Sequence, residues 1–136
     1  MLELHRPLSP LEIEQACDIR RSVLCGELHL GREAARDADD DTAHLVLALE
    51  GEKPVATGRL VQRGGLHLLE HLAVLPRFRR LGAGRAMVAY FVTAAKEAGV
   101  RELVAVAPQS ARAFFVAVEF VVEKEDGEVA LLRRQL

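Results

Sequence analysis

The chain has 136 residues, half of them hydrophobic and 28% charged, and its formal net charge is −2. This balance is typical of a globular protein in water and predicts one domain, residues 1–136, large enough to bury a core. The slightly acidic charge argues against a generally basic nucleic-acid-binding protein.

The first half of the chain predicts a strand, a helix and a three-stranded meander. Residues 2–6 alternate between apolar and polar side chains, as in a strand with one buried face. The pair Ser9–Pro10 suits the start of a helix, and apolar residues then recur at helical spacing. Three strand-like segments follow, joined by short turns that contain glycine, at 44–50, 54–62 and 66–74.

The second half alternates helices and strands. A long amphipathic run over 81–98 predicts a helix that ends at Gly99, a residue suited to the left-handed conformation after a helix. A strand, a short helix and a terminal hairpin are then expected at 101–107, 110–118, 120–124 and 129–134. The fold class is therefore α/β, with a mixed sheet and helices packed against its faces.

Two glycines, Gly82 and Gly84, stand where a strand-like segment ends and the long helix begins. The first N–H groups of a helix lack internal partners and carry the positive end of its dipole, so such a turn can bind an anion. Glycine leaves room for a phosphate beside the backbone. The turn lacks the third small residue of a dinucleotide-binding fingerprint and the Lys-Ser/Thr of a P-loop. A simple helix-start turn is the alternative to a phosphate site.

The stretch RRLGAG, residues 79–84, resembles the signature Arg/Gln-x-x-Gly-x-Gly/Ala of the GNAT superfamily of N-acetyltransferases. The preceding LAVLP strengthens the resemblance. The segment IRRSVLCGE at 19–27 is similar to the first helix of one GNAT subgroup, and 37–60 is similar to the acidic loop and strands that follow it. The resemblance implies a GNAT-type mixed, mostly antiparallel sheet of about six to seven strands with helices on both faces.

The resemblance also implies a function and a cosubstrate. GNAT proteins transfer an acetyl group from acetyl-CoA to an amine, no metal is expected, and their glycine loop binds the diphosphate of coenzyme A through main-chain amides. The matching positions in this chain are Arg79, Arg80, Gly82, Gly84 and Arg85. The strand before the loop pairs with the pantetheine arm, at positions that correspond to Leu72 and Val74. The Leu72 N–H is the expected oxyanion donor.

Glu70 is the candidate general base, because many GNAT proteins use a carboxylate on this strand and Glu70 is the only acidic residue of 66–74. Strand alternation would put it on the same side as Leu72 and Val74. His71 would point to the other side unless a bulge shifts the register. An exposed or ion-paired strand carboxylate is the alternative for Glu70.

One family motif is altered in this chain. The usual general acid of the family is a Tyr in a motif close to FYERLGF, and this chain reads FFVAVEF at 114–120. Phe115 thus stands where the Tyr is expected, and Glu119 stands where the Gly is. The only tyrosine, Tyr90, lies within the long helix and is expected to pack there. We expect acetyl transfer in a direct ternary complex; the alternative, favoured by Phe115, is a non-catalytic coenzyme A-binding or regulatory module.

The sequence leaves the acceptor open among small amines, amino acids, aminoglycosides and protein amines. The acidic run at 37–41 is either a solvated loop or a means of attracting a cationic amine. Exposed edge strands and the terminal hairpin favour a homodimer. No stretch approaches the roughly twenty apolar residues of a membrane span, and residues 1–8 lack a signal-peptide run. We therefore expect a cytoplasmic protein with neither a membrane nor a nucleic-acid partner.

Overall fold

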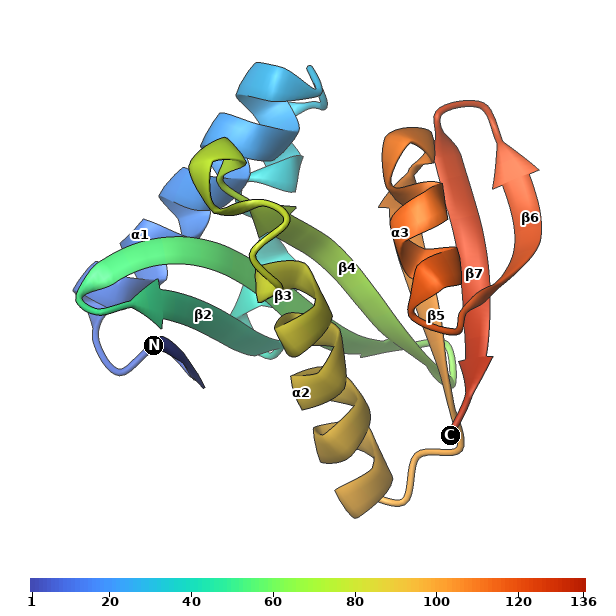
Figure 1. Ribbon diagram of the computed structural model, residues 1–136. Coiled ribbons are helices and arrows are strands. Elements are labelled where there is room, and N and C mark those ends of the chain that lie inside the picture. Colours follow the sequence, from blue (N-terminus) through green and yellow to red (C-terminus); the bar gives the residue numbers. More distant parts are fainter.

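The computed structural model describes all 136 residues. Its centre is a seven-stranded sheet in the order β1-β2-β3-β4-β5-β7-β6 (Figure 1). The strands are β1 (Leu2–His5), β2 (His44–Glu50), β3 (Lys53–Arg63), β4 (Leu66–Val74), β5 (Glu102–Pro108), β6 (Val121–Asp126) and β7 (Val129–Gln135). Every neighbouring pair is antiparallel except β4 and β5, which are parallel. The expected mixed, mostly antiparallel α/β sheet is confirmed.

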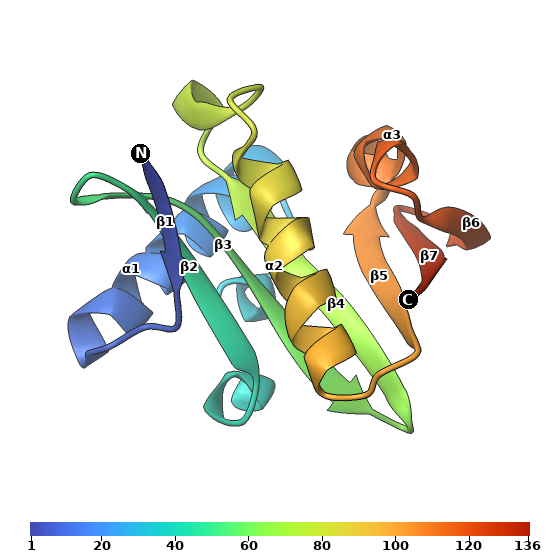
Figure 2. The same cartoon turned by 60° about the horizontal axis from the view of Figure 1, so that its bottom comes forward.

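Helices cover both faces of the sheet, as Figure 2 shows. The longer helices are α1 (Pro10–Arg20), its π-helical continuation η1 (Arg21–Glu27), α2 (Ala83–Glu97) and α3 (Arg112–Ala117). The short 3₁₀ turns are η2 (Arg32–Ala34), η3 (Ala38–Asp41), η4 (Pro76–Phe78) and η5 (Gln109–Ala111). One apolar cluster joins α1 and η1 to the sheet, and another joins α2 and α3 to it. None of these helices has the length and apolar character needed to cross a membrane.

The first helix begins where its local sequence predicts. The Ser9 side chain accepts a hydrogen bond from the Glu12 N–H at 3.2 Å, and Pro10 occupies the first turn, where a missing N–H leaves no hydrogen bond unmade. After α1 the helix widens, and the Leu28 N–H reaches back five residues to the Val23 carbonyl at 3.0 Å. The widened segment η1 forms one wall of the cleft described below.

Helix α2 confirms the run predicted over 81–98. Gly82 precedes it in the left-handed conformation, with φ 88°. At its other end Gly99 has φ 79°, and the Val100 N–H bonds the Ala95 carbonyl at 2.9 Å, which satisfies a terminal carbonyl of the helix. The buried face of α2 is apolar and consists of Ala83, Met87, Val88, Phe91, Val92 and Ala95.

A β-bulge in β4 changes the direction of the side chains that follow it. Two residues, His71 and Leu72, stand opposite the single residue Gly58 of β3. His71 has φ 54°, a left-handed conformation that is uncommon outside glycine. Strict alternation therefore does not hold here. Glu70 bonds Arg59 on the face covered by α1, whereas Leu72 and Val74 pack into the apolar cluster beneath α2. The expectation that Glu70 shares one side of the strand with Leu72 and Val74 is wrong, because the bulge inserts one extra residue between them. Glu70, His71 and Leu72 all line one cleft.

The parallel pairing of β4 with β5 is short. It joins Leu68–Glu70 of β4 to Val104–Val106 of β5 and goes no further. Beyond these pairs the two strands diverge towards their carboxyl ends (Figure 1). The backbone of β4 at 72–74 is consequently left without a partner strand on its β5 side.

Candidate functional site

A cleft of about 690 Å³ opens where β4 and β5 diverge. One wall is η1 with the residues that follow it, the floor is the end of β4, and the other wall is α3 with the end of β5. Most of the lining is apolar, and its charged side chains are Glu27, Glu70, Arg79, Arg80 and Glu128. A mostly apolar cleft with a few convergent polar groups is the usual form of a small-molecule site.

The structure gathers most of the site residues predicted from the sequence. The cleft is lined by Glu70, Leu72, Val74, Arg79, Arg80 and Gly84. Gly82, the residue before α2, and Arg85, an exposed residue in its first turn, lie outside the lining. The glycine loop and the end of β4 thus belong to one site.

The two glycines of the loop are required for different reasons. Gly82 needs its freedom of backbone conformation, because its φ of 88° is strained for any residue with a Cβ. Gly84 needs its small size, because a Cβ there would lie 3.1 Å from the ring of Phe114. Arg80 adds a second left-handed residue to the loop, with φ 65°. Such non-glycine outliers are common at ligand-binding sites.

Arg79 connects the glycine loop to the opposite wall of the cleft. Its two terminal nitrogens donate to the two carboxylate oxygens of Glu27, each at 2.7 Å, and its Nε donates to the Val74 carbonyl at 3.0 Å. Sequence reasoning did not single out Glu27. The one signal for it was its place at the end of the segment 19–27, which resembles the first helix of a GNAT subgroup.

Glu70 is both ion-paired and open to the cleft. The residue is 7% exposed, and its Oε1 accepts hydrogen bonds from Arg59 at 3.1 and 2.6 Å and from Arg63 at 3.2 Å. Its Oε2 accepts no hydrogen bond and is not fully buried. The ion-paired alternative is therefore correct as a description of Oε1, while Oε2 is left free to contact a bound molecule.

The acidic run at 37–41 supplies counter-charges to two buried arginines. Arg59, 1% exposed, donates to Asp37 at 2.6 and 2.9 Å and to Asp40 at 2.8 Å. Arg20, equally buried, donates to Asp40 at 2.6 Å. The hydrogen bonds from Arg59 lower the pKa of Asp37 to about 2. Asp37 and Asp40 therefore hold the floor of the cleft together, and neither is part of a simple solvated loop.

His71 enters the cleft through the bulge. Burial lowers the pKa of its imidazole to about 4, and the positive charges of Arg20 and Arg59 act in the same direction. Its Nε2 lies 3.8 Å from the Asp37 carboxylate. His71 is therefore neutral near pH 7 and stands between the candidate base and the candidate oxyanion donor in the strand.

The aromatic residues of the site provide no tyrosine hydroxyl. Phe115 lines the cleft and packs edge-on against Phe114 and Phe120, with ring centroids 5.1 and 5.3 Å apart. Tyr90 lies elsewhere, on α2, and its hydroxyl is 3.0 Å from the Nε2 of His44. Tyr90 thus packs against β2, as its place in the helix predicts.

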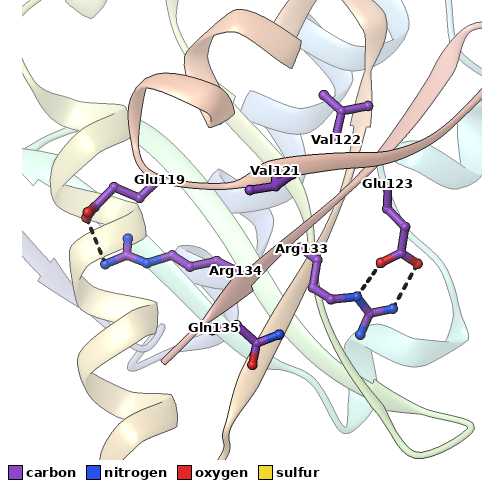
Figure 3. Close-up of a pocket in the computed structure, with 7 residues that line it drawn as sticks. All are labelled: Glu119, Val121, Val122, Glu123, Arg133, Arg134 and Gln135. Atoms are coloured by element: carbon purple, nitrogen blue, oxygen red, sulfur yellow. Dashed lines mark hydrogen bonds and ion pairs between the residues drawn. The ribbon is translucent and has the colours of Figure 1, made fainter.

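A second hollow, of about 490 Å³, lies over β6 and β7 (Figure 3). Its charged side chains already pair with one another or with neighbours: Arg133 with Glu123, and Arg134 with Glu119 at 3.2 Å (Figure 3). It contains no residue of the glycine loop and none of β4. In the whole chain, no group of three or more His, Cys, Asp or Glu side chains is arranged to hold a metal ion. The cleft between β4 and β5 is therefore the candidate site.

Known proteins are similar to this chain in sequence or in fold. YjcF of Bacillus subtilis strain 168, an uncharacterized N-acetyltransferase, is 26% identical over 104 residues, which cover 76% of this chain and 74% of that protein. A GNAT-family acetyltransferase from Staphylococcus aureus Mu50 has a TM-score of 0.83 at 14% identity and covers 100% of this chain and 99% of its own. The PaiA N-acetyltransferase of Thermoplasma acidophilum, solved in complex with coenzyme A, has a TM-score of 0.80 at 14% identity and covers 100% and 99%. The model of the acetyltransferase (GNAT) family matches residues 11–120, and this chain belongs to that family.

Proposed function

We propose that this protein transfers an acetyl group from acetyl-CoA to a primary amine within a direct ternary complex. The observation that carries the proposal is the divergence of β4 and β5 next to the N-terminus of α2. The backbone at 72–74 has no partner strand on its β5 side, where an amide-bearing chain can pair with it, and a helix N-terminus suits a diphosphate. PaiA of Thermoplasma acidophilum has the same fold and was solved with coenzyme A, which supports this cosubstrate.

The proposed cosubstrate contacts follow the cleft from β4 to the glycine loop. The main chain of Leu72 and Val74 would bind the pantetheine arm, because this edge of β4 has no partner strand. The diphosphate would be bound by main-chain N–H groups and by the nearby guanidinium groups. The residues proposed for that part are Arg79, Arg80, Gly82, Gly84 and Arg85.

The chemistry needs a proton acceptor, an oxyanion donor and a leaving group. Acetyl-CoA supplies an activated acetyl thioester. Glu70 would accept the proton of the attacking amine at Oε2, directly or through one water, while the Leu72 N–H would stabilise the charge that develops on the thioester oxygen. As the new C–N bond forms, the C–S bond breaks and the electron pair leaves on sulfur. A thiol has a pKa of about 8.5, so the thiolate can leave near neutral pH without the Tyr acid and take its proton from water.

A non-catalytic module that binds coenzyme A is the second candidate, and Phe115 is the observation that favours it. The side chain in the cleft wall where an acid is expected has no ionisable group. Binding through the main chain would survive that change, while turnover would become slower. The two candidates therefore differ in turnover and agree on cosubstrate binding.

Release of free thiol from acetyl-CoA distinguishes the two candidates. The purified protein is mixed with acetyl-CoA and, in separate reactions, with an aliphatic diamine, an amino acid, an aminoglycoside or a short peptide. The proposal predicts thiol release that depends on one class of amine. Tight binding of coenzyme A without amine-dependent thiol release would favour the non-catalytic module instead.

A further inference from the structure

All three nitrogens of the Arg79 guanidinium group donate hydrogen bonds in this structure, and the residues that accept them line the cleft. Its Nε donates to the Val74 carbonyl at 3.0 Å, and its terminal nitrogens donate to the two oxygens of Glu27, each at 2.7 Å. Two parallel N–H···O bonds are the geometry in which arginine binds a carboxylate most strongly. These hydrogen bonds hold the pKa of Glu27 below its usual value, so Glu27 is ionised near neutral pH.

Coenzyme A would compete with these contacts of Arg79. The pantetheine arm is proposed to bind β4 at Val74, whose carbonyl Arg79 already occupies. The diphosphate is proposed to bind the loop that carries Arg79. A diphosphate has more negative charge than a carboxylate, and a guanidinium group can bind either one through two hydrogen bonds. The diphosphate can therefore displace Glu27 from Arg79.

Displacement would leave Glu27 as a carboxylate without a cation. Its side chain is 40% exposed and lies on the η1 wall, where Leu24 and Leu28 also line the cleft. Glu70, by contrast, keeps its bonds to Arg59 and Arg63, which do not depend on Arg79. The other arginine of the lining belongs to the diphosphate loop. A cationic group of the second substrate can supply the positive charge that Glu27 then lacks.

We infer that cosubstrate binding moves Arg79 from Glu27 to the diphosphate and so frees Glu27 to bind a positively charged group of the acceptor. An ammonium paired with a carboxylate is held in its charged form and cannot attack a thioester. The group held by Glu27 is therefore a different one from the amine that is acetylated. The acceptor is an aliphatic diamine or a longer amine with at least two basic nitrogens, and its apolar part contacts Leu24 and Leu28. This inference rests on the proposed function.

The exchange makes the two substrates bind cooperatively. Coenzyme A releases the carboxylate that the amine needs, so each ligand raises the affinity of the protein for the other by the same factor. The coupling is of the size of a half-exposed ion pair, about two- to fivefold in affinity.

The first test is calorimetric titration of coenzyme A into the wild type and the Glu27→Gln variant. Glu27→Gln removes the competing charge and should bind coenzyme A about two- to fivefold more tightly than the wild type. Glu125→Gln is the matched control, because Glu125 forms an ion pair of similar length and exposure with Arg112, at 2.7 Å. The control should keep the wild-type affinity. An unchanged or weaker affinity in Glu27→Gln, repeated in Glu27→Ala, would overturn the exchange, because Glu27 would then only orient Arg79.

The second test uses straight-chain diamines of three to eight carbons, each compared with the monoamine of the same length. With coenzyme A in excess, the wild type should bind at least one diamine about two- to fivefold more tightly than its monoamine, and Glu27→Gln should lose this preference. Equal binding throughout the series, or a preference that survives in Glu27→Gln, overturns the inference. If the wild type binds no coenzyme A, the proposed function itself is wrong. If the wild type binds coenzyme A and Glu27→Gln binds it no more tightly, only the exchange is wrong.

Discussion

Arg59 donates two hydrogen bonds to one oxygen of Glu70, at 3.1 and 2.6 Å, and leaves the other oxygen of that carboxylate without a hydrogen bond. Arg59 is itself fixed from the far side by Asp37 and Asp40. A buried arginine that lost these partners would be strongly destabilising, so the network holds Glu70 in one orientation. The candidate base is therefore positioned by charges on a separate loop as well as by its own strand.

Replacement of Glu70 by Gln tests its role as the base. Gln keeps an oxygen that can accept hydrogen bonds from Arg59, so the fold should survive, but it cannot accept a proton. Glu70→Gln should lower kcat by about 10²- to 10⁴-fold and leave the affinity for coenzyme A unchanged. Steady-state kinetics with calorimetry measure both, and Glu125→Gln, outside the cleft, should behave as the wild type. Wild-type kcat in Glu70→Gln would remove Glu70 from the mechanism.

His71 should make the stability of the fold depend on pH. Its pKa is lowered to about 4 in the folded protein, whereas an unfolded histidine titrates near 6.5. Between these two values the unfolded chain binds a proton that the folded chain does not, so the free energy of unfolding falls as pH decreases through this window. His71→Asn, a residue that tolerates the left-handed φ, should flatten this part of the curve. Urea unfolding at several pH values measures the effect, and an identical slope in the variant would contradict the assignment.

The residues that follow α2 and α3 both have left-handed backbone conformations, but one is a glycine and the other is a glutamate. Gly99 follows α2 with φ 79°, and Glu119 follows α3 with φ 74°. Glu119→Gly should raise the free energy of unfolding by about 1 kcal/mol, and Gly99→Ala should lower it by a similar amount. Glu119 is mostly exposed in its ion pair with Arg134, so the pair adds little. Urea unfolding compares the two variants; a loss of stability in Glu119→Gly would show that its φ carries no strain.

Replacement of Phe115 by Tyr tests whether the missing acid limits turnover. Phe115 lines the cleft, so a hydroxyl on its ring should reach the leaving sulfur and raise kcat by about tenfold or more. The affinity for coenzyme A should stay the same. Phe120→Tyr is the control, because Phe120 packs against Phe115 outside the cleft lining and should change stability alone. An unchanged kcat in Phe115→Tyr would mean that protonation of the thiolate is not rate-limiting.

Elements defined by local signals could be predicted from the sequence. The N-cap at Ser9 and the glycine that closes α2 depend only on neighbouring residues, and both occur where they were expected. The mixed, mostly antiparallel sheet of about six to seven strands was expected from the resemblance to a known family, whereas the strand order and the single parallel pair come from the structure alone. The positions that line the cleft on β4 and in the glycine loop were likewise predicted from their matching motifs.

Features that depend on distant pairing could not be predicted in the same way. The bulge at His71 depends on how β4 pairs with β3, and a single strand's pattern does not record it. The acidic run binds arginines about twenty positions away, and nothing in its composition distinguishes a buried ion-pair network from a solvated loop. Glu27 meets Arg79 across 52 positions of chain, so its place in the cleft emerges only from the folded structure.

Binding of coenzyme A to the glycine loop is the central claim, and calorimetric titration of three proteins tests it directly. Gly82 and Gly51 both have positive φ, 88° and 64°, and open space where a Cβ would lie. Aspartate at either position strains the backbone to a similar degree, but only Gly82→Asp places a negative charge beside the start of α2. We predict micromolar affinity in the wild type, a loss of about tenfold or more in Gly82→Asp, and unchanged affinity in Gly51→Asp. No binding by the wild type, or equal affinity in all three proteins, would contradict the diphosphate site and the proposed function with it.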